Sequence, residues 1–303
     1  MIKNKHILGI FCALLSNIIF GFSFIFSKNA LAVSHPLVIL AVRFTVAFLC
    51  INILLALGVF KIDFKILKNP LLWALGLSQP LFYFIFELYG LSLVSSALSG
   101  VIIALVPVAV MLLSRIFLKE KPTFLQWIFT LISILGVSLI SIISNDGQQN
   151  YLFGILLLIG AVFCAAIFNI LSRKQSDTCS PFERTYMMFL VGAVGFNLIG
   201  AFSLKQDYLP LIVESVSNTR FIIAIIYLAV ISSVMAFLLY NFATSHITAI
   251  EASSFSNIIP VVTVIAGVII LKEIMTLWGF ILCGVIILGV WGVNQFTAKN
   301  KKN

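Results

Sequence analysis

The chain alternates between long apolar stretches and short polar connections. Windows of about 20 apolar residues recur along it, and about 20 residues is the length at which an α-helix crosses a bilayer. Several connections are so short that no soluble domain fits between the windows. The pattern predicts an all-α integral membrane protein with ten transmembrane helices, at residues 7–28, 36–58, 71–93, 97–118, 124–143, 153–173, 182–203, 221–243, 250–271 and 275–297.

Two of these stretches repeat each other. Ala97–Glu120 and Ile250–Glu273 align at an offset of 153 positions, with Pro107 opposite Pro260 and a Lys-Glu pair at each end. A proline inside a helix removes a backbone donor, which a membrane helix tolerates where neighbours or a cavity satisfy the freed carbonyl. Matching broken spans in the two halves of a transporter indicate its binding site. We therefore expect Pro107 and Pro260 to break their helices beside such a site.

The repeat extends to the start of each half. At an offset of 145 positions, four residues of the first half match four of the second: Gly9 with Gly154, Ser27 with Ser172, Lys28 with Arg173 and Pro36 with Pro181. Each half then holds five spans, and an odd number makes the second half enter from the opposite side of the membrane. The sequence predicts two inverted five-helix repeats, at 7–143 and 153–297, an arrangement that suits alternating access.

Composition and charge agree with a membrane location. Hydrophobic residues make up 61% of the chain and charged residues 10%, against about 25% charged in soluble domains. With a cytoplasmic N-terminus, 14 of the 19 Lys and Arg residues fall on inner segments and 4 on outer ones, and Arg43 lies within a span. This bias explains the net charge of +9 by topology. We expect a multi-pass protein of the cytoplasmic membrane with both termini cytoplasmic, the lipid bilayer as its partner, and no nucleic acid.

These features together resemble the EamA family of the drug/metabolite transporter superfamily. The resemblance rests on the five-plus-five spans, the two prolines, the Leu-Lys-Glu ends at 118–120 and 271–273, and Arg43 in an Ala-Val-Arg-Phe context. It implies a carrier, often an exporter of amino acids, metabolites or drugs, whose central cavity is lined by spans one, three, four, six, eight and nine. One departure is that Met188 stands where the first half has Arg43, so any role of that arginine is asymmetric.

Glu87 is the sharpest candidate for chemistry, because a carboxylate inside a membrane span is costly and usually faces a cavity or a partner. It shares a helical face with Gln79, Tyr83, Phe86 and Gly90. Glu87 and Arg43 lie at similar depths, ~9 Å and ~10 Å below the outer surface at 1.5 Å per residue. Three interpretations stay open: a buried ion pair that locks two spans, a Glu87 that faces the pathway and binds a cation or a proton, and a Glu87 that is water-exposed near the outer mouth.

Other polar groups also fall within spans. An amide in hydrocarbon is costly unless it is hydrogen-bonded, so each needs either a partner on another helix or a wet cavity. Both alternatives stay open for Asn17, Asn169, Asn197, Tyr240, Asn241 and Asn257. Asn257 lies just before Pro260, where it could meet a freed carbonyl or a solute. We also expect Phe20, Tyr83 and Tyr240 to line an aromatic cavity wall.

Motifs of other protein classes are missing from the sequence. It has no Walker loop, no His/Cys/Glu cluster with metal-ligand spacing and no serine elbow. The five cysteines are expected to be free thiols. We expect a secondary carrier of a small organic solute, without enzyme activity, cofactor or metal. Proton coupling, the solute and the oligomeric state stay open. The alternatives are a nucleotide-sugar or lipid-linked translocator on the same fold and an intramembrane enzyme or scaffold.

Overall fold

The computed structural model describes residues 2–117, 123–143, 150–247, 252–253, 255–272 and 276–300, and these residues form helices and no strands. Two helices, η2 and η4, are π-helical, and η1, η3 and η5 are 3₁₀ turns. The helices in chain order are α1 (Ile2–Leu31), α2 (Pro36–Ala56), η1 (Phe64–Lys68), α3 (Pro70–Gly76), η2 (Leu77–Phe82), α4 (Tyr83–Leu93), α5 (Ser96–Ile103), α6 (Val106–Phe117), α7 (Phe124–Ile143), α8 (Tyr151–Gln175), α9 (Pro181–Leu204), η3 (Lys205–Asp207), α10 (Tyr208–Val216), α11 (Thr219–Ile226), η4 (Tyr227–Met235), α12 (Ala236–His246), η5 (Phe255–Asn257), α14 (Ile258–Ile270) and α15 (Leu277–Asn300).

The described helices fall on the predicted apolar windows. Within the described residues, seven helical segments are long and apolar enough to cross a membrane. Three shorter apolar helices, Phe124–Gly136, Ile258–Ile270 and Leu277–Gly289, fall on the remaining windows. The 3₁₀ turn η1 and the helix α10 were not predicted, because both lie in connections between apolar windows.

Several helices begin where the sequence supplies a cap. Proline fits the first turn of a helix, where its missing N–H is not needed. α2 begins at Pro36, with His35 Nδ1 accepting from the amide of Leu37. α9 begins at Pro181 with a capping box, in which Ser180 Oγ accepts from the amide of Glu183 and the Glu183 carboxylate accepts from the amide of Ser180. The two helices therefore start in the same way, 145 positions apart.

The third and eighth predicted spans are each interrupted. In the third, Pro80 follows Gln79, whose backbone is extended (φ −146°, ψ 116°). The residue before a proline is driven from the helical to the extended region by a steric clash, so this break follows from the sequence. The eighth span contains the π-helical segment η4 without a proline. Beyond these segments, α4 and α12 begin and end 153 positions apart, at residues 83–93 and 236–246.

The two spans with the matching prolines, Pro107 and Pro260, are interrupted just before each proline. α5 ends at Ile103 and α6 begins at Val106, so Pro107 lies in the first turn of the second helix. Pro260 lies in the first turn of α14, after the 3₁₀ turn η5. Each proline starts a new helix and does not kink an unbroken one. The carbonyls of Ile103 and Ser256, four residues earlier, lose their usual helical donors.

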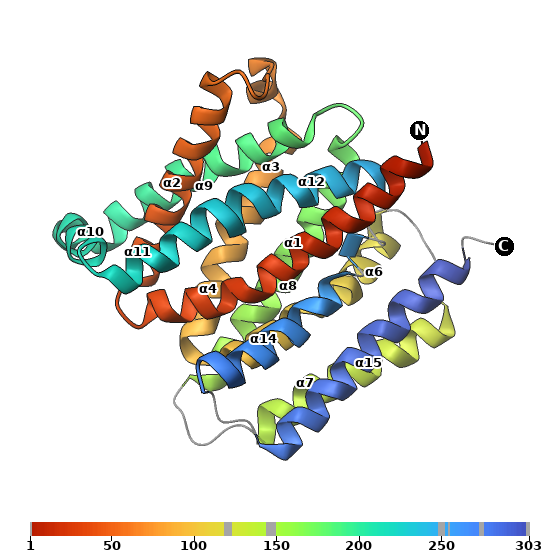
Figure 1. Cartoon of the computed structure of the whole chain (residues 1–303). Helices are drawn as coiled ribbons and strands as arrows, with labels where there is room; N and C mark the ends of the chain where they lie inside the picture. The colour runs from red at the N-terminus through yellow and green to blue at the C-terminus, as the bar shows by residue number, and fades with distance from the viewer. Residues whose placement is uncertain are drawn as a thin grey trace.

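The helices form a bundle whose centre lies between α1, α4, α5, α8, α12 and α14. α1 packs along both α12 and α14, and α4 packs along α8 (Figure 1). α7 and α15 pack chiefly on each other, as a pair at the edge of the bundle. α1 begins and α15 ends on the same side of the molecule, here called the N-terminal face. The distal face is the opposite one, where α1 ends at Leu31 and α14 ends at Ile270.

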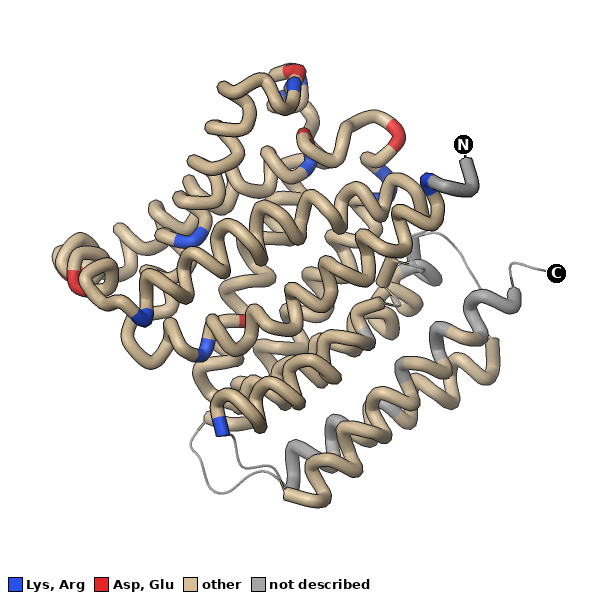
Figure 2. The backbone as a smooth tube through the Cα atoms, viewed as in Figure 1, with Lys and Arg blue, Asp and Glu red and all other residues tan. Residues whose placement is uncertain are grey.

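Charged residues gather mostly near the helix ends, and long uncharged stretches lie between them (Figure 2). Arg43 and Arg184 are nevertheless among the largest fully buried side chains. Arg43 lies within α2, and Arg184 lies in the first turn of α9. The hydroxyl and carbonyl groups of α8 and α12 accept its hydrogen bonds.

Candidate functional site

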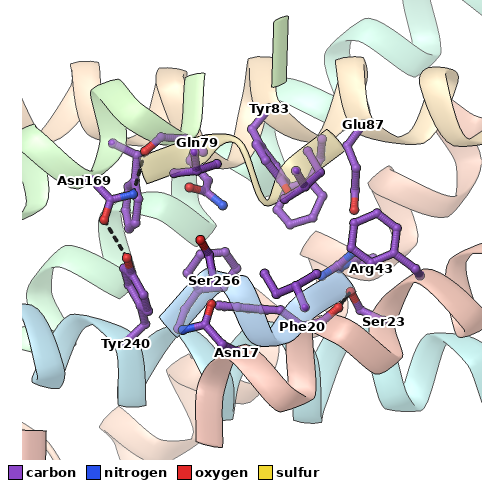
Figure 3. Close-up of a pocket in the computed structure, with 18 residues that line it drawn as sticks. Asn17, Phe20, Ser23, Arg43, Gln79, Tyr83, Glu87, Asn169, Tyr240 and Ser256 are labelled. Carbon is purple, nitrogen blue, oxygen red and sulfur yellow. Dashed lines mark hydrogen bonds between the residues drawn. The ribbon is translucent and has the colours of Figure 1, made fainter. Parts of the chain in front are cut away.

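A cavity lies at the centre of the bundle, between helices of the two sequence halves (Figure 3). It holds about 590 Å³ free of atoms, its opening included. Its walls come from α1, α2, η2, α4, α5, α6, α8, α12, η5 and α14, so segments far apart in the sequence meet there. The side chains that line it are Asn17, Phe20, Ser23, Phe24, Arg43, Gln79, Tyr83, Phe84, Glu87, Ile103, Val106, Ala165, Phe168, Asn169, Phe237, Tyr240, Ser256 and Ile259.

Seven of the eight side chains predicted for binding or coupling line this cavity. They are Glu87, Arg43, Tyr83, Asn17, Phe20, Asn169 and Tyr240. The side chain of the eighth, Asn257, lies outside the described residues, as do Glu120 and Glu273 of the two repeat ends. The geometry brings the seven together, and their role in binding or coupling stays a prediction.

Glu87 enters the cavity without a partner. Its side chain is 2% exposed, and its Oε2 atom is buried and accepts no hydrogen bond. It points toward Arg43 across the cavity (Figure 3). Yet among the described residues no ion pair within 4.0 Å joins the two, and the one ion pair found there joins Lys65 and Asp63 on the surface. The interpretation of Glu87 as half of a locked ion pair is not what this structure shows.

Arg43 is held by neutral groups. Its Nε donates to Ser233 Oγ at 3.0 Å, and its Nη2 donates to Ser232 Oγ at 3.3 Å. Its guanidinium also lies 4.3 Å from the ring centroid of Phe84, a favourable cation–π distance. Both serines belong to the π-helical segment η4, so α2 of the first half is tied to the eighth span of the second half.

The polar groups at the other end of the cavity satisfy one another in part. Tyr240 donates its hydroxyl proton to Asn169 Oδ1, and Asn169 Nδ2 donates to the carbonyl of Ala165. Asn17 Nδ2 donates to the carbonyl of Ala13 in its own helix. These bonds fix the orientations of two amides and a phenol while leaving them in the cavity wall. Tyr240 and Asn169 therefore combine the two alternatives, an interhelical bond and a place in the cavity wall, whereas Asn17 lines the cavity and, among the described residues, bonds only within its own helix.

Two other asparagines serve only as links between helices. Asn197 Nδ2 donates to Thr45 Oγ1, and its Oδ1 accepts from the hydroxyl of Tyr208. Asn241 Nδ2 donates to Thr185 Oγ1. Neither lines the cavity, so for them the structure favours interhelical hydrogen bonding.

The residues of the predicted helical face of Glu87 are divided between the cavity and the neighbouring helix α8. Gln79, Tyr83 and Glu87 line the cavity, whereas Phe86 and Gly90 pack against α8. A methyl group added at Gly90 would lie 2.7 Å from Leu158 Cγ, so α4 and α8 are in close contact there. The helix turns one edge of this face to the cavity and the other edge to a neighbour.

Sequence reasoning missed several aromatic residues of the wall. Phe20, Tyr83 and Tyr240 were predicted, and the structure adds Phe24, Phe84, Phe168 and Phe237. Phe20 and Phe237 lie 5.1 Å apart by ring centroids. The sequence repeat could have indicated them, because several lining residues of the first half align with lining residues of the second half at the offsets of 145 and 153 positions. At 145, Phe20, Ser23 and Phe24 align with Ala165, Phe168 and Asn169; at 153, Phe84, Glu87, Ile103 and Val106 align with Phe237, Tyr240, Ser256 and Ile259.

The chain is similar to transporters along its whole length. It matches the EamA-like transporter family over residues 7–142 and 152–295. It is 32% identical to the uncharacterized transporter YcxC of Bacillus subtilis, over all of this chain and 97% of the relative. An uncharacterized transporter of Archaeoglobus fulgidus is 28% identical over 89% of this chain and 93% of its own. A protein of known crystal structure has the same fold, with a TM-score of 0.66 at 16% identity and 99% of both chains covered.

These matches and the cavity together indicate the class of protein. An all-helical bundle with many apolar segments long enough to cross a membrane surrounds a polar and aromatic cavity, and its relatives are transporters. The chain belongs to the EamA-like transporter family of multi-pass membrane proteins.

Proposed function

We propose that this protein is a secondary carrier of the cytoplasmic membrane that exports a small organic solute by alternating access. The observation that carries the proposal is the central cavity, walled by both halves of the chain and containing the buried, unpartnered carboxylate of Glu87. Such a group inside a membrane protein is usually a functional one. The proposal includes ten spans in two inverted repeats, at 7–143 and 153–297.

Matching geometry in the two halves supports the inverted arrangement. α2 and α9 begin at prolines 145 positions apart, and α4 and α12 share their bounds at an offset of 153. Lys28 donates to the carbonyl of Leu91, and Arg173 donates to the carbonyl of Thr244, which are equivalent contacts at the same two offsets. With five spans in each half, these contacts fall at opposite faces of the membrane.

The basic residues support the orientation. The N-terminal face carries most of the Lys and Arg residues, which favours its placement on the cytoplasmic side. The distal face, where α1 and α14 end, is then the outer one. Export is the direction that the resemblance to drug and metabolite carriers suggests.

The cavity lining favours a solute with an apolar body and a polar or charged group. Ligand sites are usually walled by apolar and aromatic side chains with a few placed polar groups. Among the lining residues Arg43 is the one basic side chain, and two of its donors are already used by serines. A site for the phosphates of a nucleotide sugar would need more donors, so we favour the small organic solute.

Glu87 is the proposed binding or coupling group. A buried carboxylate oxygen that accepts no hydrogen bond, as Glu87 Oε2 is here, is costly in the charged form. A bound cationic group or a proton relieves this cost, and either would couple occupancy of the cavity to its shape. The proposed carrier has no enzymatic role, because the lining residues offer no cluster of nucleophile and base.

The proposal is tested by filling the cavity. Ala165→Phe should abolish flux of any solute of a mixed amino-acid and metabolite panel that wild-type protein moves into proteoliposomes, because Ala165 lines the cavity and the added ring fills space inside it. Ile167→Phe is the matched control, since Ile167 lies on the same helix with 40% of its side chain exposed. Unchanged flux in Ala165→Phe, or no flux from wild type for any solute, would contradict the proposal.

A further inference from the structure

An unusually close contact between α5 and α14 lies on the distal side of the cavity. A methyl group placed on Gly100 would lie 1.9 Å from Thr263 Oγ1, 2.7 Å from its Cβ and 2.8 Å from its Cγ2. Both residues are buried, and α5 packs along α14. No side chain larger than that of glycine fits at position 100 while α14 keeps this place.

The contact lies directly beyond the cavity wall. Ile103 and Ile259 line the cavity. Gly100 precedes Ile103 by three residues and Thr263 follows Ile259 by four, which is about one helical turn toward the distal face. A solute leaving the cavity in that direction would have to part these two helices.

Two further contacts complete the closure. A methyl group on Gly21 of α1 would lie 2.6 Å from Val262 Cβ, so α14 is seated on glycines of two different helices. Lys28 Nζ donates to the carbonyls of Leu91 and Val94, which ties the end of α1 to the chain just before α5. α1, α5 and α14 are thereby drawn together on the distal side of the cavity.

We propose that the seating of Thr263 on Gly100 is the gate of this carrier at the distal face, and that α14 leaves Gly100 when that face opens. This inference rests on the proposed function. The Thr263 hydroxyl donates to the carbonyls of Ile259 and Pro260 within α14, so it remains satisfied when the helices separate. The contact holds by shape and dispersion, without hydrogen bonds that would have to break, which suits a surface that opens and closes repeatedly.

The test follows the accessibility of a cysteine in the cavity. Ser23 lines the cavity on α1, and Ser23→Cys provides the reporter in a chain whose five native cysteines are replaced. A membrane-impermeant maleimide is applied from the distal face. With Gly100 present the reporter should be labelled slowly. Gly100→Ala should raise the labelling rate about tenfold or more, because overpacking of a close contact shifts the population away from the closed form.

Two variants control for nonspecific effects. Gly100→Ala/Thr263→Gly gives back the space and should restore slow labelling. Gly136→Ala crowds α7 against Ile286 of α15, at 2.6 Å and away from the cavity, and should leave labelling slow. Labelling that Gly100→Ala does not change, or that Gly136→Ala raises equally, would overturn the gate.

A second measurement does not depend on the folding of Gly100→Ala. Thr263→Ala leaves Gly100 in place and removes the Oγ1 and Cγ2 atoms that lie against it. The closed contact then loses dispersion attraction, so the Ser23→Cys reporter should be labelled faster from the distal face, and labelling at the unchanged slow rate would overturn the gate. The labelling assay needs no solute, so it tests the gate separately from the proposed function. Altered labelling without flux of any solute would contradict the carrier proposal but not the gate. Flux with unaltered labelling would contradict the gate alone.

Discussion

At the scale of single residues, Arg43 and Glu87 are the informative pair because they lie close in the same cavity without forming an ion pair. A buried arginine satisfied by neutral oxygens leaves the carboxylate free, and a free carboxylate can respond to a proton or a solute. Ser232 and Ser233 thus act indirectly, by holding Arg43 in place. Sequence alone could not identify them, since a Ser-Ser pair in an apolar span has no distinctive pattern.

Ser233→Ala tests this arrangement. The change leaves the buried Nε of Arg43 without its acceptor, and we expect a loss of about 1–2 kcal/mol of stability, seen as a lower midpoint of thermal unfolding in detergent. Ser233→Thr keeps a hydroxyl and should keep most of the stability. Ser92→Ala is the control, since that hydroxyl donates to the carbonyl of Tyr89 within its own helix. Equal midpoints for Ser233→Ala and Ser92→Ala would contradict the role of Ser233.

At the scale of helices, the sequence predicted the apolar elements well and their interruptions only in part. Apolar windows locate helices because a bilayer demands about 20 apolar residues whatever the packing. Pro107 and Pro260 pointed to two interruptions. The break at Gln79 carried the same kind of signal in Pro80, which was not used, whereas the π-helical segment η4 has no proline and depends on packing between helices.

The sequence predicted the polar residues of the candidate site but not several of its aromatic residues. Asn17, Glu87 and Asn169 stand out because a polar group in an apolar span needs an explanation. Phe168 and Phe237 do not, because phenylalanine is common throughout this chain and serves lipid-facing and core positions equally. Only the fold, or the repeat applied residue by residue, separates the lining rings from the others.

Arg184 shows how three helices are joined near the N-terminal face. Its guanidinium donates from α9 to Ser172 of α8, at 2.8 Å to both the carbonyl and the hydroxyl, and to Asn241, Thr244 and Ser245 of α12. The planar fork of five donors is what lets one side chain reach all these oxygens.

Arg184→Lys should therefore be strongly destabilising although the charge is kept. A lysine has three donors at one point and cannot serve both helices, so we expect a loss of at least about 2 kcal/mol in thermal or denaturant unfolding. Arg220→Lys, at an exposed position at the start of α11, should have little effect. Similar stability of the two variants would show that the network contributes little.

At the scale of the whole molecule, the cavity exists because two similar halves meet. Lining residues of α1 correspond to lining residues of α8, and those of α4, α5 and α6 correspond to those of α12, η5 and α14. The correspondence is broken at the residues that bear charge. Glu87 is matched by Tyr240, and Arg43 is matched by Met188, which is not among the lining residues, so the first half supplies both the carboxylate and the guanidinium of the cavity wall. A carrier built this way has a symmetric frame for rocking and an asymmetric site for recognition.

The central claim is that Glu87 couples this cavity to transport. The direct measurement is flux in proteoliposomes of a solute that the wild-type protein moves, with and without a pH gradient, for wild type and Glu87→Gln. Glu183→Gln, at a partly exposed acid in the capping box of α9, is the control. We predict that Glu87→Gln loses gradient-driven flux and keeps counterflow of the same solute. Gradient-driven flux that is equal in wild type and Glu87→Gln would contradict the claim and leave Glu87 as part of the cavity wall.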